Sequence, residues 1–144
     1  MITSFISLQI NTVNYLHELI YLKNSLVKLG KLFMINMKIT TPCEEAYRVE
    51  VPVLRIAIAK KLIERGMPVV KAAKAVGISA TTYEKQIKEK WEEVRKVLED
   101  EEVGDMIESL VGRILSNQLI EPTSFCLLCS RARRLFDLTP CPNF

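Results

Sequence analysis

Apolar side chains recur every three or four residues along most of this chain, and no stretch alternates apolar and polar residues as a half-buried strand does. Helices are predicted between Pro52 and Gly66, over residues 68–76 and over residues 105–119. A longer helix is predicted over residues 80–98, where the apolar stripe consists of Tyr83, Ile87, Trp91, Val94 and Leu98. The pattern therefore predicts an all-α fold, and the long stripe needs either a helical partner within the chain or a second copy of it.

Charge density divides the chain near residue 37. Residues 1–36 hold four charged side chains, whereas residues 37–144 hold 33 together with all four cysteines and all six prolines. Residues 1–36 are interpreted as an N-terminal extension with one amphipathic helix, or as a segment preceding a natural start at Met34 or Met37. We expect a helical domain over residues 37–119, in which the acidic run 99–102 is a solvated connection, and an irregular tail rich in Cys and Arg over residues 120–144.

The overall composition excludes several classes of protein. The formal charge of +3 is too small for a protein that coats nucleic acid non-specifically, and the one histidine, His17, rules out a site built from several histidines. No run of eighteen apolar residues predicts a membrane span, and no signal peptide is evident. We expect a cytoplasmic protein. We do not expect an enzyme, because the sequence shows no glycine-rich phosphate loop and no pair of nucleophile and base.

The most informative stretch is residues 68–87, which predicts a helix-turn-helix. Small side chains at Ala72 and Ala73 let a second helix approach closely, Gly77 supplies a positive φ at the turn, and Ser79 caps the second helix. The alternative is a simple helical corner, or the same fold used for protein contacts. In the DNA-binding interpretation the residues at the interface are Ser79, Ala80, Thr81, Thr82, Lys85 and Lys88. Glu84 departs from this pattern, because a carboxylate repels phosphate unless it points away or accepts from a cytosine.

Three further blocks flank this motif in a recognisable order: residues 41–44 (TPCE), 51–55 (VPVLR) and 125–129 (FCLLC). With the predicted helix-turn-helix they resemble the small archaeal predicted transcriptional regulators that carry a Cro/repressor-like helix-turn-helix and a Cys-containing C-terminal tail. The resemblance covers about residues 37–144. It implies sequence-specific binding of duplex DNA in the cytoplasm.

The four cysteines are candidate metal ligands. Two thiolates separated by two residues can hold one ion from a single helical turn, and two more complete a tetrahedral site. The predicted site consists of Cys43, Cys126, Cys129 and Cys141, with zinc or an iron–sulfur cluster as the cofactor. The alternatives are a redox or disulfide pair, or plain thiols without a metal.

These observations predict a DNA-binding transcriptional regulator that responds to a metal or to redox state. We expect a homodimer, because one short recognition helix reads only a few base pairs. The alternative is a helical adaptor of the transcription apparatus that contacts proteins and does not bind DNA. A basic face that joins Lys85 and Lys88 to Arg131, Arg133 and Arg134 would favour DNA, whereas an acidic face would favour the adaptor.

Overall fold

The computed structural model describes residues 39–144, which are helical over most of their length and contain no strand. The elements are α2 (Pro42–Glu64), α3 (Val69–Ala75), α4 (Ala80–Glu89), α5 (Trp91–Glu99), α6 (Glu101–Leu115), α7 (Pro122–Ala132) and a short 3₁₀ helix, η1 (Arg133–Phe136). The predicted all-α class is confirmed. The extension predicted over residues 1–36 lies outside the described residues.

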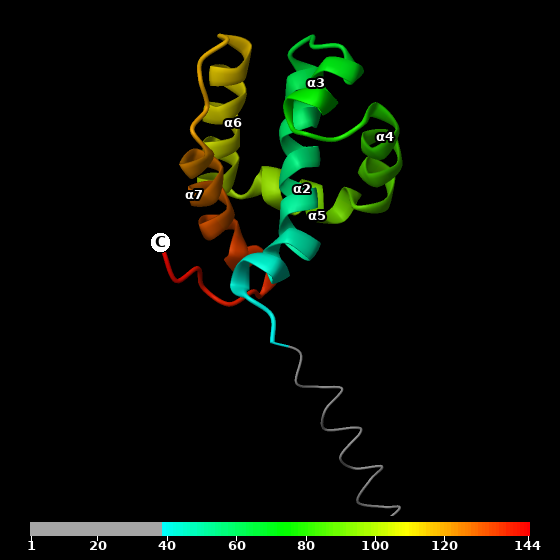
Figure 1. The fold of residues 1–144 in the computed structure, drawn as a ribbon. Coiled ribbons are helices and arrows are strands. Elements are labelled where there is room, and N and C mark those ends of the chain that lie inside the picture. The colour runs from blue at the N-terminus through cyan, green and yellow to red at the C-terminus, as the bar shows by residue number, and fades with distance from the viewer. Residues whose placement is uncertain (1–38) are drawn as a thin grey trace, which may run out of the picture. The chain divides into compact units, whose positions relative to one another are not determined.

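Helix α2 is the central element, and α3 and α4 lie on one side of it while α6 and α7 lie on the other (Figure 1). The helix begins ten residues before the predicted start at Pro52, which lies inside it. A capping box explains the earlier start: Glu44 N–H donates to Thr41 Oγ1 (3.2 Å), and Thr41 N–H donates to Glu44 Oε2 (2.7 Å). Packing against the five other α-helices and η1 holds α2 together through Pro52, which lacks an N–H for the helical hydrogen bond.

The predicted long helix over residues 80–98 is wrong, because the chain turns at Lys90 and forms α4 and α5 instead. Lys90 has φ −113° and ψ 24°, outside helical values, although its N–H still donates to Gln86 O (2.9 Å). The turn lets Tyr83 on α4 and Val94 on α5 both reach the core, while Trp91 between them stays 42% exposed. Local periodicity predicts a helical stripe, but it does not show that the stripe is shared between two helix axes.

The acidic run 99–102 does contain a connection, but this is the single extended residue Asp100 between α5 and α6, and the other three residues are helical. Asp100 caps α6 by accepting from Val103 N–H (2.9 Å), and Glu101 and Glu102 occupy the first turn, where the helix dipole favours negative charge. Gly104 lies within α6, where an added Cβ would be 3.0 Å from the carbonyl oxygen of Leu98. This close approach lets α6 begin directly after α5.

The irregular tail predicted over residues 120–144 is wrong for residues 122–136, which form α7 and η1, whereas residues 137–144 contain no helix; α7 packs against α6 and α2. Residues 40–144 form one compact unit, with the side chains of Leu128 and Ala132 on α7 fully buried in its core. The largest fully buried apolar side chains of this core are Leu54, Ile56, Leu62, Ile107, Leu128, Val53, Val94, Val97, Val103 and Val111.

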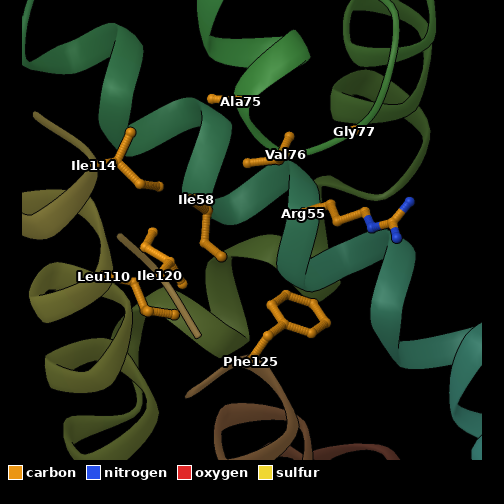
Figure 2. A pocket seen from close by; sticks show the side chains of 9 residues that line it. All are labelled: Arg55, Ile58, Ala75, Val76, Gly77, Leu110, Ile114, Ile120 and Phe125. Carbon is orange, nitrogen blue, oxygen red and sulfur yellow. The ribbon is translucent and has the colours of Figure 1, made fainter. Parts of the chain in front are cut away.

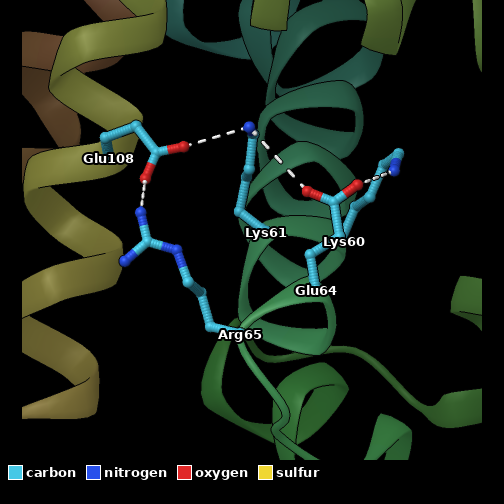
Figure 3. Close-up of polar contacts among 5 residues, drawn as sticks. All are labelled: Lys60, Lys61, Glu64, Arg65 and Glu108. Atoms are coloured by element: carbon cyan, nitrogen blue, oxygen red, sulfur yellow. Dashed lines mark hydrogen bonds and ion pairs between the residues drawn. The ribbon is translucent and has the colours of Figure 1, made fainter.

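Ion pairs join the C-terminal end of α2 to α6 (Figure 3). Glu108 on α6 accepts from Lys61 Nζ (3.0 Å) and from an Arg65 guanidinium nitrogen (2.6 Å), and Lys61 also lies 3.8 Å from Glu64. Glu64 pairs in turn with Lys60. These contacts fix the end of α2 from which α3 departs.

Within residues 39–144, no helix is both long and apolar enough to cross a membrane.

Candidate nucleic-acid interface

Helices α3 and α4 are joined by a four-residue turn at the residues that the sequence predicts. Ala72 and Ala73 are fully buried, so that α3 lies directly against its neighbours. Gly77 has φ +75°, a value that costs a residue with a side chain strain energy. The buried small side chains of Ala72 and Ala73 and the positive φ of Gly77 therefore agree with the sequence prediction.

Ser79 begins α4 as its N-cap. Thr82 N–H donates to Ser79 Oγ (3.0 Å), and the two hydroxyl oxygens are hydrogen-bonded at 2.7 Å. Ser79 and Thr81 are exposed, whereas Ala80 and Thr82 are half-buried. The first turn of α4 is thus rigidly capped and presents two hydroxyl groups to solvent.

The outward face of α4 consists of Thr81, Glu84, Lys85 and Lys88. All four are exposed and are spaced by three or four residues, while Tyr83 is buried on the other side of the helix. Lys85 is 73% exposed and lies 4.0 Å from Glu89, one turn along. Glu84 does not point away from this face, so a carboxylate stands between the two lysines and Thr81.

The described chain has its net positive charge over residues 69–90, which comprise α3, α4, the turn between them and Lys90. Residues 69–90 hold five lysines and two glutamates, a formal excess of three positive charges. The remaining residues of the described range 39–144 hold eleven Lys and Arg against fourteen Asp and Glu, a formal excess of three negative charges. The exposed lysines of this region are Lys71, Lys74, Lys85 and Lys88. The described part of the chain is therefore polarised, with its excess of positive charge over this one motif.

The arginines of α7 and η1 do not extend this basic region. Arg134 bonds Asp100 (2.6 Å), Arg131 lies 3.5 Å from Glu102, and Arg133 is 2% exposed. Figure 1 shows α7 and α4 on opposite sides of α2. The single basic face expected from α4 together with these arginines does not form, because acidic residues at the start of α6 pair with Arg131 and Arg134.

The apolar stripe of the predicted long helix is satisfied within the chain. Tyr83 and Val94 are buried, and Ile87 and Leu98 pack partly buried against the core. An intrachain helical partner, one of the two partners that the pattern called for, is therefore present. The homodimer stays a prediction, but the apolar stripe is no longer an argument for it, because the stripe packs within the chain.

The four cysteines are free thiols, and residues 39–144 contain no group of three or more His, Cys, Asp or Glu side chains arranged to hold a metal ion. Packing does bring two of the relevant segments together: Arg133 donates to Pro42 O and to Thr139 O, both at 2.8 Å. The segments that carry Cys43 and Cys141 therefore lie near each other. The site predicted at Cys43, Cys126, Cys129 and Cys141, with its zinc or iron–sulfur cluster, stays a prediction.

A buried polar cluster at Glu50 was not predicted. Glu50 on α2 is fully buried, and its carboxyl group interacts with the Cys129 thiol and the Arg133 guanidinium. Burial raises the pKa of Glu50 to about 7, although the Cys129 thiol and the Arg133 guanidinium both lower it. Burial and the nearby Glu50 carboxyl raise the pKa of Cys129 to about 12, so this thiol is protonated at neutral pH. The position of Glu50 on the apolar face of α2, four residues after Ala46, is the signal that could have revealed it.

The sequence matches no protein-family model and no curated protein, and the structure matches no solved structure.

Proposed function

We propose that this protein binds duplex DNA through α3, the turn and α4, and that it regulates transcription. The observation that carries the proposal is the charge polarity: residues 69–90 have a formal excess of three positive charges, and the rest of the described chain has the opposite excess. A duplex attracts a protein with local positive charge even where the whole chain is only mildly basic. The same charge polarity directs this motif, rather than α6 and α7, toward the duplex.

In this proposal α4 enters the major groove with its capped end leading. Thr81, Glu84 and Lys85 reach base edges, since they are exposed on the outward face near the start of the helix. Lys88 and the α3 lysines contact phosphates on either side. One helix of ten residues covers few base pairs, so two copies of the chain bind adjacent half-sites.

The test measures binding of the full chain to a labelled random-sequence duplex by fluorescence anisotropy, between about 50 and 200 mM salt. The variant K85Q/K88Q removes two exposed positive charges from α4. We expect weaker binding and a salt dependence that is shallower by about one unit, because Lys88 is the phosphate contact of this pair and each lost phosphate contact lowers the slope by about 0.9.

The matched control is R48Q/R131Q, which removes the same charge from two exposed side chains outside α3 and α4. We expect this control to keep the wild-type slope, which separates a local contact from a general effect of net charge. Equal slopes in the two double variants would exclude α4 from the interface.

A second candidate function is supported by Glu84. Its exposed carboxylate lies at the centre of the outward face, beside Lys85, and such mixed charge suits a protein partner better than a polyanion. In that case the protein is an adaptor of the transcription apparatus. The two functions differ in the same assay, since an adaptor shows no binding to duplex DNA even at about 50 mM salt.

A further inference from the structure

A cavity of about 350 Å³ lies between α2, the end of α3 with its turn, α6 and α7. Ile58, Leu110, Ile114, Ile120 and Phe125 form most of its wall, as Figure 2 shows. Its other lining residues are Arg55, Ala75, Val76 and Gly77. The volume falls at the lower end of the range that small-molecule sites occupy.

Arg55 supplies the one charged group among these nine lining residues. Its guanidinium extends away from the aliphatic side chains toward the turn, and an added Cβ at Gly77 would lie 3.9 Å from it. Within the described part of the chain, Arg55 forms no ion pair and no side-chain hydrogen bond, unlike Arg65, Arg113, Arg133 and Arg134. A half-buried guanidinium without a partner, beside an apolar wall, is complementary to a ligand that is apolar at one end and anionic at the other.

We propose that this cavity binds a small apolar carboxylate, with its hydrocarbon part against Ile58, Ile114 and Phe125 and its carboxylate paired with Arg55. The lining residues include no acidic side chain that would repel the anion. The fork of a guanidinium matches the two oxygens of a carboxylate, so the pair is bidentate. An apolar chain of modest length fills the remaining space.

The position of the cavity gives the ligand a regulatory role, and this step rests on the proposed function. Ala75, Val76 and Gly77 belong both to the cavity wall and to the junction between α3 and α4. A ligand that contacts these residues changes the energy of one placement of α4 relative to α3. The ligand changes the affinity for DNA only if it binds the DNA-competent placement of α4 more tightly, or less tightly, than the other placements.

Isothermal titration calorimetry of the full chain tests the ligand site without DNA. The probes are octanoate and 3-phenylpropionate, which separate aliphatic from aromatic acids, and octanamide, a neutral analogue of octanoate. We expect at least one acid to bind. Octanoate should bind about tenfold more tightly than octanamide, because only its carboxylate forms a charge-assisted pair with the half-buried Arg55.

Two variants locate the site. We expect R55Q to remove the preference for octanoate over octanamide, whereas R48Q, a matched loss of charge at an exposed position of α2, keeps it. We expect A75L to weaken binding of every probe, because its larger side chain fills the cavity from an exposed position and leaves the core unchanged. Equal binding of the acid and the amide to the wild-type chain overturns the proposal, and so does equal behaviour of R55Q and R48Q.

The DNA assay separates this inference from the proposed function. Loss of DNA affinity in R55Q without any ligand, together with unchanged calorimetry, would make Arg55 a phosphate contact and overturn the ligand site. Binding of a carboxylate to a chain that binds no DNA would retain the site and remove the regulatory step.

Discussion

Replacing the buried Glu50 with glutamine is expected to remove a pH dependence from the stability of this protein. Glutamine keeps the shape of the side chain but does not ionise. In the wild-type chain the carboxyl is fully buried, with a pKa of about 7 in the folded state against an ordinary value of 4.5. Cys129 on α7 and Arg133 at the start of η1 are the groups that interact with it.

The sign follows from which state binds the proton. Below pH 4.5 the carboxyl is mostly protonated in both states, so burying it places no charge in the core. As the pH rises from 4.5 to 7, the unfolded chain releases the proton first, so the free energy of unfolding falls. Above pH 7 the folded protein is also ionised and the loss levels off at about 3 kcal/mol, from a shift of about 2.5 pK units.

The measurement is urea unfolding of the full chain at pH values from 4.5 to 8, for the wild type and E50Q. We expect the stability advantage of E50Q over the wild type to grow by about 3 kcal/mol across this range. The control E84Q removes an exposed carboxyl from α4 and should follow the wild-type curve.

A constant difference between E50Q and the wild type at every pH would refute the reasoning. It would mean that Glu50 has the same pKa folded and unfolded, and that Arg133 or solvent compensates its charge fully. A growing difference in the opposite direction would mean that the carboxylate stabilises the fold as an ion pair with Arg133, which donates to Pro42 O and Thr139 O.

Further predictions concern α6, α4 and α7. In the same urea assay, G112A should raise the free energy of unfolding by about 1 kcal/mol, because alanine favours the helix and nothing lies within 4 Å of the added Cβ. G104A should not raise it, because the added Cβ would lie 3.0 Å from the carbonyl oxygen of Leu98. E84Q should bind a random-sequence duplex more tightly than the wild type, and it should lose any preference for cytosine at one position of selected duplexes. An unchanged affinity would mean that Glu84 does not contact the DNA. Exposed Cys126 should react with iodoacetamide faster than Cys129 at neutral pH, as mass spectrometry of the peptide resolves; equal rates would contradict the raised pKa of Cys129. Elemental analysis of anaerobically purified protein should find zinc or iron in stoichiometric amount if the predicted cysteine site forms, and its absence would contradict that site.

Features that depend on neighbouring residues alone could be predicted from the sequence. Helical periodicity gave the all-α class, and the small residues before Gly77 gave the junction between α3 and α4. Ser79 as the N-cap of α4 is of the same kind, because a hydroxyl three residues before a free N–H needs no distant partner. These features follow from sterics and hydrogen bonding within one or two helical turns.

Tertiary structure decided the features that need partners from elsewhere in the chain. Local rules favour beginning a helix at Pro52 and continuing one through Lys90, but in the structure α2 begins ten residues before Pro52 and the chain turns at Lys90. The sequence indicates that Arg134 belongs to a basic edge, but in the structure it pairs with Asp100 at 2.6 Å. The burial of Glu50 and the cavity beside Arg55 both depend on the packing of α7 against α2 and α6. Periodicity shows which side of a helix is apolar, whereas the charge, pKa and accessibility of a side chain depend on which distant residues that side meets.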